Sequence, residues 1–120
     1  MKASFLIAAL AVLKTCTPAP AAELTRQQVD GLSSAIYRAE GGDKARVPYG
    51  VLSVKVSGKD EARRVCERSI VNNYARWQKA GKPGEFISFM ADRWCPASAD
   101  PRGNVNWKNN VRKIYGKEIK

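Results

Sequence analysis

Apolar residues recur at helical spacing in four stretches of the chain, and clear end signals bound the first of them. This helix is predicted to start at Thr25, because "TRQQ" has the form of a capping box with Gln28 three residues after the N-cap threonine. It is predicted to stop at Gly41 and Gly42, since glycine readily takes the left-handed conformation that ends helices. Its apolar face consists of Val29, Leu32, Ile36 and Ala39.

The same spacing predicts three more helices. The second covers about 57–79, where "SGKD" is a candidate capping box formed by Ser57 and Asp60. The third covers 85–94 and the last about 106–115. The residues expected to face the core include Trp77, Phe86, Phe89, Met90, Trp107, Val111 and Ile114.

Two segments between these helices have a different composition. "VPYGVLSVKVSG" is rich in β-branched and aromatic residues and is bounded by proline and glycine, which predicts short extended segments or a small hairpin. "CPASADPRGNVN" has the proline, glycine, aspartate and asparagine content of an ordered loop. The predicted fold class is therefore α+β and mainly α, with one small β element after the first helix.

The first 22 residues have the composition of an export signal. "FLIAALAVL" is an apolar run too short to span a bilayer, and "PAPAA" supplies the small residues of a cleavage site. An uncleaved membrane anchor and a lipoprotein modified at Cys16 are the alternatives. We expect residues 1–22 to be a signal peptide and residues 23–120 to be a single domain without stable membrane insertion.

Two cysteines, Cys66 and Cys95, remain after the signal. An even pair in an exported protein predicts a disulfide, which would close a loop of about 30 residues and stabilise the fold by roughly 3–4 kcal/mol. Two free buried thiols are the alternative. The chain has no histidine, so we expect no metal site, and nothing in the sequence indicates a cofactor.

The chain is strongly basic, with a formal charge of +10, or +8 once Lys2 and Lys14 leave with the signal. Such a surface favours polyanions: nucleic acid, acidic lipid head groups or an anionic cell-wall polymer. Export argues against nucleic acid. The basic residues are spread along the chain, so a solvated basic face is an equal alternative.

Glu40 is the candidate for chemistry, because it stands in the last turn of the first helix on the face of Ile36 and Tyr37. Burial and the partial negative charge of a helix C-terminus both disfavour an ionised carboxyl group. A carboxyl group that keeps its proton can serve as a general acid. The alternative is an exposed glutamate at a frayed helix end, paired with Arg38 or Lys44.

The order of these features resembles the lysozyme-like superfamily of lytic transglycosylases and goose-type lysozymes. In that family a helix ends in glutamate and a "G-L-M-Q"-like segment follows, and here "YGVLS" follows Glu40. The stretch "FISFMADRWCPASADPRGNVNWKNNVRKIY" is similar to the C-terminal part of small bacterial and phage members. The resemblance covers roughly residues 24–115 and implies a lysozyme-like fold.

The resemblance also implies an activity, a location and partners. The chain would be a bacterial peptidoglycan glycosidase, periplasmic or secreted, with Glu40 as general acid/base at the β-1,4 bond between N-acetylmuramic acid and N-acetylglucosamine. Its substrate would be the glycan strands, and a cell-envelope complex is a further candidate partner. Ser53 stands where the family often has glutamine. The candidate substrate-binding residues are Tyr49, Gly50, Ser53, Asn73, Tyr74, Trp94 and Asp100.

Several alternatives stay open from the sequence. No second catalytic carboxylate stands out among Asp43, Asp60, Asp92 and Asp100, which favours the lytic transglycosylase route over a two-carboxylate hydrolase. Arg46 could contact the anionic part of peptidoglycan or be a solvated loop charge. The rival functions are a non-catalytic peptidoglycan-binding protein and a secreted cationic protein that acts on membranes or inhibits an enzyme.

Overall fold

The fold was analysed in a computed structural model that describes residues 23–50 and 57–120. These residues form four α-helices, and two short 3-10 turns separate the first two. The elements are α2 (Arg26–Ala39), η1 (Gly42–Lys44), η2 (Pro48–Gly50), α3 (Lys59–Lys79), α4 (Phe86–Trp94) and α5 (Pro101–Tyr115). The prediction of a mainly helical chain is confirmed.

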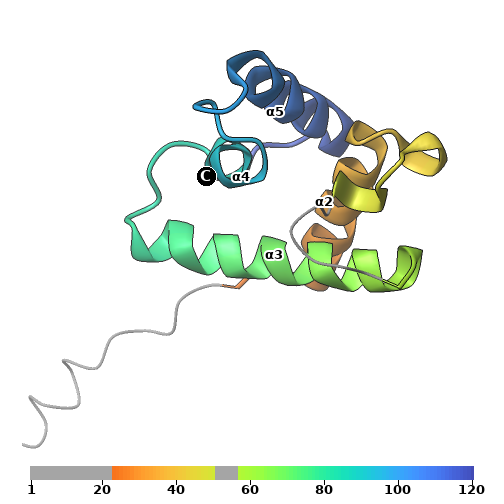
Figure 1. The fold of residues 1–120 in the computed structure, drawn as a ribbon. Helices are drawn as coiled ribbons and strands as arrows, with labels where there is room; N and C mark the ends of the chain where they lie inside the picture. The colour runs from red at the N-terminus through yellow and green to blue at the C-terminus, as the bar shows by residue number, and fades with distance from the viewer. Residues whose placement is uncertain (1–22, 51–56) are drawn as a thin grey trace, which may run out of the picture.

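Helix α2 lies between α3 and α5 and packs against both (Figure 1). The long helix α3 also packs against η2 and α4, and α4 in turn packs against α5. The end of the chain returns to the start of α4, where the backbone N–H of Phe86 donates to the carbonyl of Ile119 at 2.9 Å. The last turn of α2 is thus held among α3, α5 and the two 3-10 turns.

The core is formed by apolar side chains from all four helices. Its fully buried members include Leu32, Ile36, Ile70, Trp77, Phe86, Ile87, Met90 and Val111. Tyr74 packs edge-on against Phe86, with ring centroids 5.2 Å apart, and also contacts Trp77. None of the helices within 23–50 and 57–120 combines the length and apolar character needed to cross a membrane.

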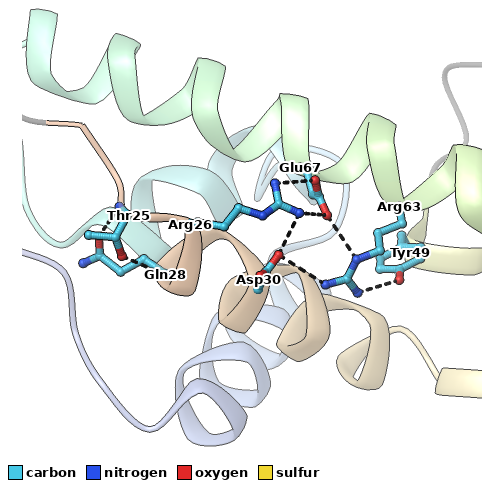
Figure 2. Close-up of polar contacts among 7 residues, drawn as sticks. All are labelled: Thr25, Arg26, Gln28, Asp30, Tyr49, Arg63 and Glu67. Carbon is cyan, nitrogen blue, oxygen red and sulfur yellow. Dashed lines mark hydrogen bonds and ion pairs between the residues drawn. The ribbon is translucent and has the colours of Figure 1, made fainter.

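Both ends of α2 agree with the sequence prediction. The N–H of Gln28 donates to the Thr25 hydroxyl at 3.1 Å, and the N–H of Thr25 donates to the Gln28 amide oxygen at 2.8 Å (Figure 2). This reciprocal pair is the predicted capping box. At the other end Glu40 is the C-cap, and Gly41 follows in the left-handed region with a φ of 111°.

A charged cluster joins α2 to α3. The guanidinium of Arg26 donates to both oxygens of Glu67 at 3.0 and 3.1 Å and lies 2.9 Å from Asp30 (Figure 2). Arg63 donates to Glu67 at 3.1 Å and to the Tyr49 hydroxyl at 3.1 Å. The Arg26–Glu67 pair thus adds a polar contact with paired hydrogen bonds between α2 and α3.

The predicted starts of α3 and α5 were wrong. Gly58, not Ser57, is the N-cap of α3, and Ser57 donates from both its N–H and its hydroxyl to Glu61 instead of pairing with Asp60.

Helix α5 begins at Pro101 rather than near residue 106, because Asp100 caps it by accepting from the N–H of Gly103 at 2.9 Å. An aspartate N-cap followed by proline at the first helical position is a strong start signal, so half of the predicted loop is helical. With this register, Ile114 is 38% exposed, although it was expected in the core.

The predicted small β element is not seen: the described residues contain no strand. Its start lies in η2, where the N–H of Gly50 donates to the carbonyl of Val47 at 3.1 Å. Pro48 has no N–H to offer a strand partner and suits this tight turn. The rest of the predicted element, residues 51–56, lies outside the described residues.

The predicted disulfide was also wrong, since Cys66 and Cys95 are both free thiols. Cys66 is fully buried in the middle of α3, and this burial raises the pKa of its thiol to about 12. Cys95 caps the end of α4 and is half-buried. Burial, followed by the carboxylates of Asp100 and Glu40, raises the pKa of the Cys95 thiol.

We predict that the two thiols differ in reactivity. Iodoacetamide at pH 8 should alkylate Cys95 in the native protein while Cys66 stays unmodified, because the buried thiol is both inaccessible and almost entirely protonated. Peptide mass spectrometry after labelling without reductant measures both sites, and labelling in denaturant is the control. Recovery of a disulfide-linked peptide that contains both cysteines would contradict the structure.

Candidate functional site

The carboxyl group of Glu40 lies directly against the backbone of residue 50. A Cβ atom built on Gly50 would lie 2.7 Å from the carboxyl carbon of Glu40 and 2.8 Å from each of its oxygens. Gly50 has a φ of 64°, in the left-handed region that favours glycine. Only a residue without a side chain can therefore occupy position 50 while the carboxyl group keeps its place.

A second contact fixes the other side of the Glu40 carboxyl group. Trp107, from α5, donates its indole N–H to Oε1 of Glu40 at 2.8 Å. The Trp107 ring is buried, and it stacks on Trp94 with centroids 5.7 Å apart and planes 26° from parallel. Trp107 is the one side-chain donor to the Glu40 carboxyl group among the described residues.

Two anchors hold the loop that brings Gly50 to Glu40. At the first, Asp43 accepts from the Tyr37 hydroxyl and from Lys59 Nζ, the latter at 3.0 Å. The hydrogen bond from Tyr37, with a smaller contribution from Lys59, lowers the pKa of Asp43. At the second, Tyr49 is buried against the ring of Tyr37, 4.9 Å between centroids.

Tyr49 itself has an unusual backbone, with a φ of 59°. A residue with a side chain in this region carries a strain on the order of 1–3 kcal/mol, which the surroundings must offset. Here the offset comes from the burial of its ring and from the hydrogen bond with Arg63. The turn formed by Tyr49 and Gly50, both at positive φ, directs the backbone toward Glu40.

Glu40 lines a groove with a volume of about 480 Å³, which we call the Glu40 groove. The end of α2, the loop before η2, the end of α4 and one face of α5 contribute to it. Its lining residues are Ala39, Glu40, Arg46, Val47, Gly50, Trp94, Cys95, Gly103, Asn106, Trp107 and Asn110. The volume is in the range of small-ligand sites, and the lining combines apolar, aromatic and amide groups.

The α5 wall of the groove follows helical spacing. Gly103, Asn106, Trp107 and Asn110 stand at positions i, i+3, i+4 and i+7 and therefore share one face. Asn106 and Asn110 are exposed, and each offers an amide donor and acceptor. This face presents one aromatic ring flanked by two amides.

Glu40 is the only carboxylate among the described residues that line the groove. The remaining aspartates weighed from the sequence have other positions: Asp60 lies in the exposed first turn of α3, Asp92 accepts from Asn104, and Asp100 caps α5. Residues 51–56 contain no aspartate or glutamate, so they add none. No cluster of three or more potential metal ligands occurs in the described part of the chain.

The structure brings together three of the residues predicted for the site: Glu40, Gly50 and Trp94. Tyr49 is buried beneath the loop, and Asp100 acts as a helix cap rather than as a lining residue. Ser53 lies outside the described residues.

Asn73 and Tyr74 are located elsewhere. Asn73 is buried and donates to the carbonyl of Ser69 at 2.9 Å, and Tyr74 packs in the aromatic part of the core. Neither side chain lines the groove, because this part of α3 faces α4.

Sequence reasoning missed Trp107, Asn106 and Asn110 as site residues. Trp107 was expected in the core, and it is buried, but its indole N–H also reaches Glu40 across 67 positions of the chain. The available signal was the spacing of Asn106, Trp107 and Asn110, which puts both amides on the helical face of this tryptophan.

Comparison of the chain with protein-family models, with curated proteins and with solved structures gave no match. The function is therefore inferred from the geometry of the groove.

We predict that Gly50→Ala is more damaging than Gly42→Ala. Both glycines have a similar positive φ, 64° and 61°, so both variants carry comparable backbone strain. A Cβ at residue 42 meets nothing within 4 Å, whereas one at residue 50 strikes Glu40. Strain of about 1–3 kcal/mol should lower Tm by several degrees in both variants, and the clash should add a further loss in Gly50→Ala.

Thermal unfolding followed by circular dichroism measures this difference. Equal Tm values for the two variants would contradict the close contact between Glu40 and residue 50.

Proposed function

We propose that the protein is a peptidoglycan-cleaving glycosidase, in which Glu40 acts as general acid/base on the bond between N-acetylmuramic acid and N-acetylglucosamine. One observation carries the proposal: a single carboxyl group at a helix end is fixed by Gly50 and Trp107 within an open, aromatic-lined groove. The resemblance to lytic transglycosylases and goose-type lysozymes points to the same residue.

The arrangement suits proton transfer to a leaving oxygen. The Trp107 N–H holds one carboxyl oxygen, and Gly50 prevents the group from swinging away, so the orientation of the other oxygen is limited before substrate arrives. Such preorganisation lowers the barrier of a proton transfer, which also requires the acid to carry its proton at the working pH. Glu40 would protonate the glycosidic oxygen as the bond to C1 of the muramyl residue breaks.

The rest of the groove suits a glycan. Half-buried Trp94, backed by the buried ring of Trp107, offers an apolar surface for a sugar ring, while Asn106 and Asn110 can donate to and accept from hydroxyl and acetamido groups. An amphipathic ligand of this kind needs both types of contact side by side. The α5 face supplies them within two helical turns.

The lack of a second carboxylate in the described groove favours the lytic transglycosylase route. An inverting or retaining hydrolase places two carboxyl groups around the bond, one of them as nucleophile or base. In the alternative route Glu40, ionised after it has donated its proton, takes a proton from the 6-hydroxyl of the muramyl residue. That oxygen then bonds to C1 and closes an anhydro ring, so no second acidic residue is needed.

A non-catalytic peptidoglycan-binding protein is the second candidate function. The aromatic and amide groups of the α5 face would serve binding equally well, and Glu40 would then have no chemical role. The two functions differ in what happens to the glycan strand after it binds.

We predict that Glu40→Gln abolishes cleavage of purified sacculi. The amide keeps the shape of the side chain but cannot donate a proton as the acid does, so activity should fall at least about 100-fold. Turbidity clearing and mass spectrometry of the released muropeptides measure the loss and reveal whether the ends are anhydro sugars. Glu118→Gln, at an exposed position outside the groove, is the matched control.

The variant must keep its far-ultraviolet circular dichroism. Undiminished clearing by a folded Glu40→Gln protein would reject Glu40 as the acid. Binding without clearing by the wild-type protein would favour the second candidate.

We predict a different effect for each of the two groove tryptophans. Trp107→Phe keeps an aromatic ring but removes the N–H that orients the Glu40 carboxyl group, so kcat should fall about 10- to 100-fold. Trp94→Phe keeps the stack and leaves Glu40 hydrogen-bonded, so it should mainly raise KM. Steady-state kinetics on soluble glycan fragments separates the two, and the same change in both variants would refute this division of roles.

A further inference from the structure

Arg46 lines the Glu40 groove from the loop between η1 and η2, and its side chain is exposed. None of the ion pairs among the described residues includes Arg46. Residues 1–22 and 51–56 contain no aspartate or glutamate, so these segments hold no side-chain partner for it either. Arg46 is thus a guanidinium group without an intramolecular carboxylate partner.

Three of the described arginines form ion pairs, and Arg46 is one of several that do not, but it is the one described arginine that lines the Glu40 groove. Arg26 and Arg63 share Glu67 and Asp30, and Arg112 lies 3.4 Å from Glu85. The Arg26–Glu67, Arg63–Asp30 and Arg112–Glu85 pairs connect different elements of the fold, whereas Arg26–Asp30 lies within α2 and Arg63–Glu67 lies within α3. Arg46 forms no such ion pair in the described structure, and it belongs to the loop that leads to Gly50.

Guanidinium is suited to bind a carboxylate through two parallel hydrogen bonds. The groove already contains one carboxylate, that of Glu40, yet no ion pair forms between it and Arg46. The positive group therefore remains available to a molecule in the groove, and the net charge of +10 favours the approach of an anionic one.

We propose that Arg46 forms a carboxylate-binding subsite that selects glycans with anionic substituents over uncharged glycans. The inference rests on the proposed function, because it assigns the ligand of the same groove. In peptidoglycan the carboxylate has two sources: the lactyl group of a muramyl residue without a peptide, or the stem peptide of a substituted one. An uncharged chitin-type oligosaccharide has the same backbone linkage and lacks both.

Binding to the inactive Glu40→Gln protein tests the proposal without turnover. Isothermal titration calorimetry is done with three oligosaccharides of equal length: muramyl-containing with free lactyl carboxylates, muramyl-containing with stem peptides, and chitin-type. Each is titrated into Glu40→Gln alone and in combination with Arg46→Ala, Arg46→Lys or Arg76→Ala. Arg76 is an exposed arginine of α3 that does not line the groove, so its removal matches the change in net charge.

Arg46→Ala should weaken binding of one or both anionic ligands about 10-fold or more and leave binding of the chitin-type ligand within about twofold. Arg46→Lys keeps the charge without the planar fork, so it should lose part of this affinity. Whichever anionic ligand responds identifies the lactyl group or the stem peptide as the source of the carboxylate. Arg76→Ala should have no effect beyond about twofold.

An equal loss for all three ligands, an equal effect of Arg46→Ala and Arg76→Ala, or no binding by any ligand would overturn the proposal. Failure of the proposed catalysis has a different signature. In that case the wild-type protein leaves sacculi intact, while the preference for anionic ligands and its dependence on Arg46 persist.

Discussion

The contact between the Glu40 carboxyl group and the backbone of residue 50 is the constraint on which the rest of the site depends. The carboxyl group fits only because residue 50 has no side chain and because its backbone is in the left-handed region. The same contact ties the end of α2 to the loop that follows it. The end of α2 is thereby held in one position. The Glu40 side chain lies between the backbone of residue 50 and the indole N–H of Trp107.

This constraint is maintained by groups that never reach the groove. Tyr49 stays in its strained conformation because its ring is buried and its hydroxyl accepts from Arg63. Arg63 belongs to the same charged cluster that joins α2 and α3, so the packing of the helices and the shape of the loop are coupled (Figure 2). The contact of Asp43 with Lys59 fastens the other end of the loop to the start of α3.

The groove combines three chemical features in a small volume: one carboxyl group, a pair of stacked indoles with neighbouring amides, and a guanidinium without a partner of its own. These features are the basis of the proposed glycan cleavage and of the proposed preference for anionic glycans. Three of the positively charged side chains, those of Arg26, Arg63 and Arg112, form ion pairs within the protein. The Arg26–Glu67 and Arg112–Glu85 pairs use part of this charge in contacts between elements of the fold.

Local sequence signals determined much of the helical structure, since caps and apolar spacing act over a few residues. The capping box of Thr25, the end of α2 at Glu40 and the extent of α4 follow from such signals. Prediction failed where two local signals competed. The start of α5 at Asp100 and Pro101 lies in a segment whose composition is also typical of a loop. The turn at Pro48 was interpreted as the beginning of a strand.

Cys66 and Cys95 were paired by composition and exported context, but α3 and α4 leave both thiols free. The meeting of Trp107 with Glu40 and the placing of Arg46 at the same groove were decided only by tertiary structure. Contacts between residues far apart in the chain depend on how α2, α5 and the loop pack, and no short stretch of sequence contains that information.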